Sequence, residues 1–227
     1  MDDAPESELD ALLKTLRVWD LPELPSLDPG GSPADPRALF TEWFADAVAA
    51  GQPEPHTMSL ATADDRGRPD VRTVMLHGVD ARGWLFASHA TSRKGRQLAA
   101  RPEAALGFYW PARARQVRVR GPVTVLPARE ARADLARRTT GALAAALTGR
   151  QSEVLSSREE LASASATAWE RARSEPDAVA PTWTLYALAA REVEFFQGDA
   201  RRQHVRLRYV HERDAQGDRW RRELLWP

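Results

Sequence analysis

The fold is decided by one stretch near the C-terminus, Glu194-Phe195-Phe196-Gln197-Gly198-Asp199-Ala200-Arg201-Arg202-Gln203-His204-Val205-Arg206. A short apolar run, typical of a strand, ends at a glycine turn and continues into a cluster of arginines around one histidine. Guanidinium groups gathered on a loop suit a phosphate ester, because they offer both charge and directed hydrogen bonds. The stretch therefore predicts strands that complete a β-fold late in the chain and carry an anion site.

A second segment, Thr91-Ser92-Arg93-Lys94-Gly95, is built from the same residue types. It lies between an expected strand and a helix that begins near Lys94. The free N–H groups of that helix start could join the Ser92 hydroxyl and both cations around a phosphate. The alternative is a solvated basic helix start with a serine cap. Arg72, inside another expected strand, either clamps a phosphate or extends to solvent at a sheet edge.

Short strands separated by turn sequences occupy most of the chain on both sides of a helical insert. Expected strands cover residues 57–63, 69–79, 84–88, 106–110, 116–126, 182–188, 192–196, 206–212 and 219–225. Expected helices cover residues 37–50, 128–147 and 158–173. Strands linked by hairpins in this way predict a mainly β fold with helices (α+β), built on a closed or half-closed antiparallel barrel.

Residues 1–36 differ from the rest of the chain. Leucines at positions 9, 12, 13 and 16 recur at helical spacing, so one short helix can form there. Proline and glycine residues between Pro22 and Pro36 then interrupt regular structure. We therefore expect a flexible N-terminal arm over residues 1–36 and one domain over residues 37–227. Asp35-Pro36 supplies a helix cap followed by proline at the first helical position.

Composition argues against several classes of function. The 227 residues include 32 basic and 32 acidic side chains, so no basic excess indicates nucleic-acid binding. There is no cysteine, and the 5 histidines show no metal-ligand spacing. No dinucleotide fingerprint, P-loop or nucleophile elbow is found. No apolar run reaches the roughly 20 residues of a membrane helix, and no signal-peptide profile opens the chain. We expect a cytoplasmic protein without a metal.

Further polar residues are candidate binding groups. Gln116 on a strand and Gln151-Ser152 after a helix break could hydrogen-bond a heteroaromatic ring, because an amide offers a donor and an acceptor side by side. The alternative for each is an ordinary surface residue. If the chain is extended, Arg202, His204 and Arg206 share one face and repel one another unless an anion neutralises them. The alternative is an exposed basic edge strand.

Taken in order, these segments resemble the pyridoxamine 5′-phosphate oxidase family, the FMN-binding split β-barrel flavoproteins. The resemblance runs from about Arg37 to Pro227. Its carriers are Ser59-Leu60-Ala61-Thr62, Arg72-Thr73-Val74-Met75-Leu76, Thr91-Ser92-Arg93-Lys94-Gly95, Arg115-Gln116-Val117-Arg118-Val119-Arg120-Gly121, Arg150-Gln151-Ser152, Glu194-Phe195-Phe196-Gln197-Gly198, Arg202-Gln203-His204-Val205-Arg206 and Leu224-Leu225-Trp226-Pro227. The resemblance implies an antiparallel split barrel with a helical insert, and a homodimer that holds FMN in a groove between its subunits.

The resemblance also implies which residues bind the cofactor. They are Arg72, Arg93 and Lys94 at the phosphate, Val74 and Gln116 at the flavin ring, Leu76 as a further cofactor residue, Ala87 and Ser88 at the position of a family Tyr-Thr pair, Gln151 and Ser152 reaching the phosphate end from the partner subunit, and Phe196 and Arg206 in contact with the cofactor. Phe196 stands where the family usually has tryptophan, so it can pack on a ring but has no indole N–H donor.

On the substrate side the sequence departs from the family pattern. By the resemblance, the substrate residues are His77 in place of a lysine, Asp134 in place of a tyrosine, Ala142 in place of a serine, and Arg138, Arg202 and His204, which match the family. Arg202 and His204 are the catalytic candidates, because they match the pair that closes over the substrate ring and its phosphate. An aspartate beside a phosphate repels it by ~1–4 kcal/mol, which argues against pyridoxine phosphate as the substrate.

Three functions remain open on the sequence. The first is an FMN-dependent oxidase that oxidises a pyridoxine or pyridoxamine phosphate, or another small cyclic amine or alcohol, with O2 as acceptor. The second is a secondary-metabolism oxidase of the phenazine-biosynthesis type, acting on a different ring. The third is a non-catalytic flavin- or haem-binding protein on the same barrel.

Overall fold

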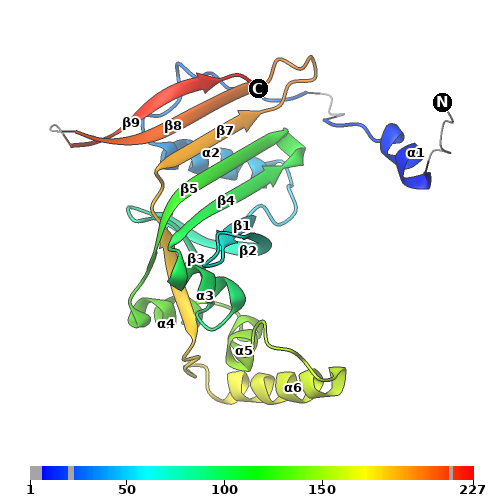
Figure 1. The fold of residues 1–227 in the computed structure, drawn as a ribbon, viewed down its shortest axis with the longest axis vertical. Coiled ribbons are helices and arrows are strands. Elements are labelled where there is room, and N and C mark those ends of the chain that lie inside the picture. The colour runs from blue at the N-terminus through cyan, green and yellow to red at the C-terminus, as the bar shows by residue number, and fades with distance from the viewer. Residues whose placement is uncertain (1–6, 20–22, 215–216) are drawn as a thin grey trace.

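The computed structural model describes residues 7–19, 23–214 and 217–227, which form the mainly β, α+β architecture expected from the sequence (Figure 1). The strands are β1 (Thr57–Ala63), β2 (Pro69–Asp80), β3 (Gly83–His89), β4 (Glu103–Trp110), β5 (Arg115–Val125), β6 (Trp183–Leu188), β7 (Glu192–Gln197), β8 (Val205–Asp214) and β9 (Gly217–Leu225). The α-helices are α1 (Glu8–Thr15), α2 (Pro36–Ala49), α3 (Arg93–Ala100), α4 (Ala128–Ala136), α5 (Thr140–Thr148) and α6 (Arg158–Ser174).

The sheet closes into an antiparallel barrel. Strands β1, β2, β3, β6, β5 and β4 pair in that order, and β4 pairs back onto β1. The barrel is split at β5, because two different strands pair with successive parts of one edge of β5. Val123–Val125 pairs with β6, whereas Arg115–Arg120 pairs with β7, from which β8 and β9 extend. The predicted closed or half-closed antiparallel barrel is confirmed.

Glycine is required where the two partners of β5 separate. A Cβ on Gly121 would lie 2.0 Å from the carbonyl oxygen of Ala189 and 2.9 Å from the backbone nitrogen of Arg191. Any larger residue would push the β6–β7 turn away from β5. The split that divides the sheet therefore depends on one position without a side chain.

Alternating side chains and one helix fill the barrel. On β5, Val117 and Val119 are fully buried while Gln116 and Arg118 face outward, as the period-two pattern predicted. Helix α2 begins at the expected cap, where the Asp35 side chain accepts a hydrogen bond from the Arg37 backbone N–H. It closes the barrel with an apolar face that buries Leu39, Phe40, Trp43 and Ala47.

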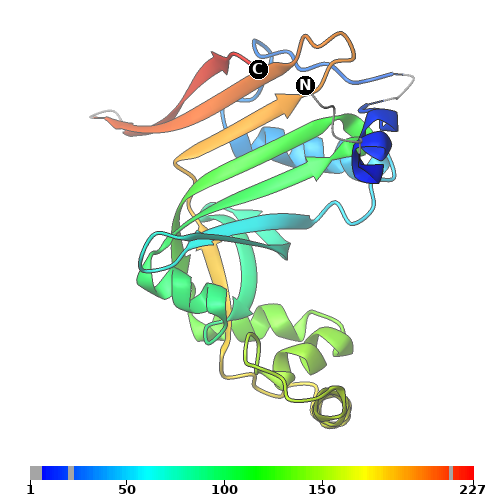
Figure 2. The same ribbon diagram turned by 45° about the vertical axis from the view of Figure 1, so that its right-hand side comes forward.

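The helical insert differs in one respect from the sequence expectation. Residues 128–147, expected as a single helix, form α4 and α5 with a break between them. The break follows from Thr139, whose side chain accepts from the Ala142 N–H and caps a new helix. Helices α5 and α6 lie at the end of the molecule opposite to β8 and β9 in both views (Figures 1 and 2).

The N-terminal segment contains the short helix that leucine spacing predicted. Helix α1 has no buried residue and stands clear of the barrel in Figure 1. Further on, the segment docks on the body, because Tyr209 donates its hydroxyl to the Pro33 carbonyl and Arg222 donates to the Ser32 carbonyl. Residues 1–6 and 20–22 of the predicted arm lie outside the described residues, so its flexibility stays a prediction. None of the described helices is long and apolar enough to cross a membrane.

Candidate functional site

A pocket of about 530 Å³ follows the free edge of β2, within the range of roughly 300–1,000 Å³ typical of small-molecule sites. Residues 69–75 of β2 pair with β1, whereas the pairing with β3 begins only at Leu76. Among the described strands, none therefore pairs with the second edge of residues 70–75, whose backbone groups can bind a ligand. The pocket is lined by Asp70, Val71, Arg72, Thr73, Val74, Met75, His77, Ala87, Ser88, Arg93, Lys94, Gln151, Ser152 and Trp183.

Arg72 is held rigidly on the wall of this pocket. Its Nη1 donates to the Leu60 carbonyl at 3.1 Å and to the Thr62 hydroxyl at 2.6 Å. Its Nη2 donates to Gln97 Oε1 at 3.0 Å and lies 2.7 Å from Asp70 Oδ2. With 19% of its side chain exposed, Arg72 is a fixed cation of the pocket and does not extend to solvent. The sheet-edge alternative for Arg72 is thus wrong.

The N-terminus of α3 forms one end of the pocket. Ser92 is buried, accepts from the Gly95 N–H and donates to the His89 carbonyl, so it caps the helix. A Cβ on Gly95 would lie 2.3 Å from the Ala90 carbonyl oxygen, so only glycine permits this tight start. Lys94 is 8% exposed, and burial, with Arg72 nearby, lowers its pKa. The serine cap of the solvated alternative is present, but the lysine is not solvated.

The loop after α5 completes the same end. Gln151 Oε1 accepts from Lys94 Nζ at 2.8 Å and from the Ser88 hydroxyl at 3.2 Å. Ser152 accepts from the Arg93 backbone N–H at 3.1 Å. The resemblance implied that Gln151 and Ser152 reach the phosphate end from the partner subunit. In the structure both contact the α3 start of their own chain instead, because the α5–α6 loop folds back onto it.

Charge is unevenly distributed along this end of the pocket. Three cations, Arg72, Arg93 and Lys94, face a single carboxylate, Asp70, which lies 3.3 Å from Arg93 Nε. Two positive charges are therefore uncompensated among the lining residues. Cations held this close together favour an anion, which removes their mutual repulsion.

At the other end of the pocket, His77 belongs to a network with Asp134 and Arg138, in which the carboxylate and the guanidinium balance each other's charge. His77 lines the pocket, and its Nδ1 lies 2.7 Å from Asp134 Oδ2. Arg138 donates to Asp134 Oδ1 at 2.8 Å. Burial alone would raise the pKa of Asp134, but the hydrogen bonds from His77 and Arg138 outweigh it and hold that pKa below its ordinary value. Asp134, Arg138 and Ala142, the substrate candidates on the helices, do not line the pocket themselves.

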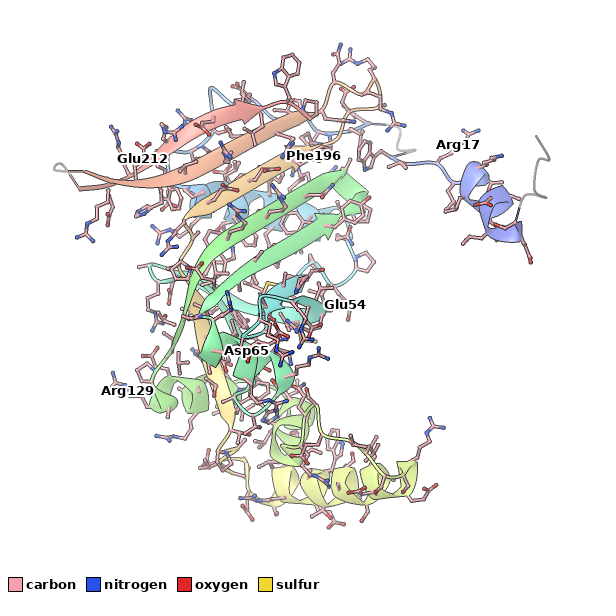
Figure 3. All side chains as sticks on the ribbon, viewed as in Figure 1. Arg17, Glu54, Asp65, Arg129, Phe196 and Glu212 are labelled. Atoms are coloured by element: carbon pink, nitrogen blue, oxygen red, sulfur yellow. The ribbon has the colours of Figure 1, made fainter. Side chains whose placement is uncertain are left out.

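A second group of candidate residues crosses the sheet away from the pocket. Gln116 on β5 is in register with Phe196 on β7, which is in register with Arg206 on β8. None of these three lines the pocket, and Phe196 lies near the far end of β7 (Figure 3). Arg206 donates to the buried Glu194 carboxylate at 3.0 and 3.1 Å and to the Trp226 carbonyl at 2.9 Å. We call Gln116, Phe196 and Arg206 the strand row.

His204 and Arg202 adjoin the strand row but do not share a strand with Arg206. Arg202 has a φ of 66° in the turn before β8, so the expectation of one extended face is wrong. His204 Nδ1 accepts from the Asp199 backbone N–H at 3.0 Å. Its ring lies 5.3 Å from Phe196 and 5.0 Å from Trp19, which places an aromatic cluster at this corner.

The structure thus gathers most, but not all, of the predicted cofactor residues. Those that line the pocket are Arg72, Val74, Ala87, Ser88, Arg93, Lys94, Gln151 and Ser152. Leu76 does not, because its side chain packs against the barrel core. Sequence reasoning missed Asp70 and Trp183, which also line the pocket. Asp70 could have been found two residues before Arg72, since strand side chains repeat with a period of two, whereas Trp183 carries no sequence signal.

Comparison with known proteins agrees with this geometry. The sequence profile described as "Pyridoxamine 5′-phosphate oxidase" matches residues 44–172, and that described as "Pyridoxine 5′-phosphate oxidase C-terminal dimerisation region" matches residues 183–227. A pyridoxine/pyridoxamine 5′-phosphate oxidase of Burkholderia lata is 43% identical over 190 residues, covering 84% of this chain and 88% of the relative. One of Pseudomonas fluorescens is 42% identical and covers 86% and 90%.

Solved structures show the same fold. PhzG from Burkholderia lata, in complex with tetrahydrophenazine-1-carboxylic acid, superposes with a TM-score of 0.81 at 31% identity, covering 90% of this chain and 99% of that one. An FMN-binding protein from Nostoc punctiforme, at 21% identity and a TM-score of 0.67, shares the fold. The molecule is an antiparallel split β-barrel, and the family profiles and relatives place it among the oxidoreductases. The chain belongs to the pyridoxamine 5′-phosphate oxidase family.

Proposed function

We propose that this protein is an FMN-dependent oxidase of a small ring substrate, with the cofactor phosphate at the α3 end of the pocket. The surplus of positive charge around Arg72, Arg93 and Lys94 is the observation that carries this proposal. A phosphate monoester carries about −1.5 to −2 charges at neutral pH, which matches two uncompensated cations. Buried Lys94 and rigid Arg72 lose little freedom on binding, so most of their attraction becomes affinity.

The rest of the pocket fits a flavin ring. Val74 and Ala87 supply apolar walls, and the free edge of β2 offers alternating N–H and C=O groups. Backbone groups of this kind suit an imide, which presents acceptors and a donor in one plane. The Ser88 and Ser152 hydroxyls lie near the cations and can donate to phosphate oxygens.

We further propose that two copies of the chain assemble around the cofactor. The strand row does not reach the pocket of its own chain, yet Phe196 and Arg206 lie in the region matched by the family's dimerisation profile. Val71, Met75 and Tyr109 on β2 and β4 are more than half exposed, which is apolar surface that a second subunit would cover. In such a dimer the strand row of one subunit would face the pocket of the other.

In this arrangement bound FMN would supply the redox chemistry, a two-electron oxidation of the substrate with O2 as the acceptor. The protein binds the substrate and orients it. Phe196 can pack on a ring face. His204 accepts at Nδ1 from the Asp199 N–H, so its neutral form carries the proton on Nε2 and can donate it to a substrate atom. Arg202 is exposed and can pair with an anionic substrate group.

A secondary-metabolism oxidase of a non-B6 ring is the second candidate. The observation in its favour is the structural neighbour at 31% identity, which binds tetrahydrophenazine-1-carboxylic acid, a ring compound without phosphate. The relatives of Burkholderia lata and Pseudomonas fluorescens, named for pyridoxine and pyridoxamine phosphates, favour the first candidate.

An absorbance spectrum of the purified protein tests the proposal. We expect the two visible bands of oxidised flavin, one FMN released per chain on denaturation, and bleaching of the bands under anaerobic conditions by a ring amine, alcohol or dihydro-aromatic substrate. Pyridoxine 5′-phosphate and a dihydrophenazine carboxylate distinguish the two candidates. A colourless protein that takes up no FMN on titration would contradict the assignment.

A further inference from the structure

Helix α1 has an apolar face that its own chain leaves exposed. Leu9, Leu12, Leu13 and Leu16 follow the spacing i, i+3, i+4 and i+7, so they lie on one side of the helix. Each of these four leucines is between 55% and 69% exposed. Isolated helices shorter than about 12–15 residues are marginal in water, and α1 has 8 residues. The helix therefore needs a surface that covers its leucines.

A second exposed apolar surface lies on the helical insert. A cavity of about 230 Å³ opens between α5, α6 and the loop that joins them, and we call it the insert hollow. Its apolar lining consists of Ala145, Val154, Leu155, Leu161 and Ala164. Val154 is 92% exposed, Leu155 45% and Leu161 48%. A groove of this kind accepts the apolar face of an amphipathic helix, whose contacts recur at i, i+3, i+4 and i+7.

The charged residues of the insert hollow do not favour a small anionic ligand. Arg150 lines the hollow, and its guanidinium pairs with Glu153 at 2.9 Å and with Glu160 at 2.6 Å. Both carboxylates line the hollow as well. A phosphate or carboxylate would therefore meet two acidic groups around one arginine that is already paired. An apolar occupant avoids this repulsion.

The leucine face of α1 and the insert hollow lie too far apart to meet within one chain while Trp19 is docked. The Trp19 ring lies 5.9 Å from that of Phe196 and 5.0 Å from that of His204, and a Cβ on Gly198 would come within 3.1 Å of Trp19 Cδ2. Helix α1 ends at Thr15, four residues before Trp19, so at most about 14 Å of chain separates them. Helices α5 and α6 lie at the opposite end of the molecule from β8, which begins beside this corner (Figures 1 and 2).

A second copy of the chain can bring the two surfaces together. In the proposed dimer the strand row of one subunit faces the pocket of the other, and Trp19 packs on Phe196 of that row. Gln151 lines both the pocket and the insert hollow, so the hollow adjoins the place where the strand row of the second subunit would arrive. Helix α1, tethered to Trp19, would then lie beside the α5–α6 loop of the other subunit.

We propose that α1 of each subunit docks its leucine face in the insert hollow of the other, so that the two subunits exchange their N-terminal segments. This inference rests on the dimer of the proposed function. The α5–α6 loop also holds Gln151 against Lys94 and Ser152 against the Arg93 N–H. The exchanged helix thus packs on the same loop that completes the α3 end of the pocket.

Amide hydrogen exchange of residues 9–16, followed by mass spectrometry, measures whether α1 is packed. We expect exchange at least about tenfold slower than in an unstructured chain, because a docked helix exposes its amides only when it opens. Leu161→Asp in the insert hollow should return these residues to the rate of an unstructured chain, while sedimentation still shows a dimer. Val125→Asp is the matched control, because Val125 is 67% exposed on β5 and lies outside the hollow. It should leave the protection unchanged.

Cross-linking shows which subunit supplies the helix, and the absence of cysteine from the sequence makes the reaction specific. Two differently tagged chains, one with Leu12→Cys and the other with Leu161→Cys, are co-expressed and treated with a short bifunctional thiol reagent. We expect a covalent heterodimer that carries both tags. The pair Leu12→Cys and Val125→Cys is the control and should give no such product.

The two measurements separate the inference from the dimer on which it rests. A monomeric protein counts against the proposed dimer, and the inference falls with it. A dimer whose residues 9–16 exchange at the rate of an unstructured chain overturns the inference while the dimer stands. Protection that survives Leu161→Asp also overturns it, because α1 is then docked elsewhere. So does a cross-link that forms only inside one chain when Leu12→Cys and Leu161→Cys are combined in it.

Discussion

The α3 end of the pocket and the strand row both contain arginine, yet the charges around their arginines differ. Around α3, three cations share one carboxylate. In the strand row, Arg206 is already paired with the buried Glu194, which also accepts from Arg118. The difference teaches that arginine count alone does not identify an anion site. The α3 end has positive charge available for a ligand. In the strand row, the charge of Arg206 is already paired with Glu194 within the sheet.

Removing the surplus positive charge at the α3 end is the strongest test of this difference. Arg93→Ala combined with Lys94→Ala should weaken FMN binding by about 100-fold or more, because two charge-assisted hydrogen bonds are worth roughly 1.5–3 kcal/mol each. Flavin retained through gel filtration, followed by absorbance, measures the loss. Arg101→Ala at the C-terminal cap of α3 is the control and should leave affinity unchanged. Full retention of flavin by the double variant would refute the phosphate assignment.

A change in the strand row should affect stability first. Arg206→Met leaves the buried Glu194 with Arg118 as its remaining arginine partner, at a cost of roughly 3 kcal/mol in the free energy of unfolding. That corresponds to a fall of about 6–12 °C in Tm for a chain of this size. Thermal unfolding by circular dichroism measures it. The double variant Arg206→Met with Glu194→Met should recover much of the loss, since no carboxylate is then left buried. Equal Tm values for wild type and Arg206→Met would show that the row is not held by this pair.

The smallest expected effect concerns His89, which lies beneath the α3 end. Burial, together with the positive charge of Lys94, lowers the pKa of His89. The pKa of His89 is therefore lower in the folded state than in the unfolded state. As the pH falls below about 6.5, the unfolded chain binds a proton at His89 that the folded chain does not bind. Stability should fall over this window, and less steeply in His89→Gln. Urea unfolding at pH 7.5 and 5.5 gives the two slopes, and identical slopes would contradict the prediction.

Local patterns in the sequence were sufficient to predict the strands. Val117 and Val119 alternate with Gln116 and Arg118, and burial in the structure follows that alternation because it obeys pleat geometry. The break at Thr139 was missed, since the Ala/Leu/Arg-rich composition around it favours helix on both sides and a lone threonine gives a weak cap signal.

Contacts between distant segments could not be predicted in the same way. His77 and Asp134 are 57 residues apart, and the local sequence around either residue does not indicate that they are in contact. The left-handed backbone of Arg202 was equally hidden, because arginine has no preference for that conformation. Which subunit supplies Gln151 depends on the direction in which the α5–α6 loop turns, and the local sequence does not determine that direction.

The pairing of β3 with β6 has a consequence for how the chain acquires its pocket. These strands bring residues 84–89 against residues 183–188, so the barrel cannot close until the helical insert has been traversed. Such long loop closure is slow, and during synthesis the N-terminal strands wait with an unpaired edge. Because Trp183 at the start of β6 lines the pocket, the pocket is complete only after β6 has been synthesised.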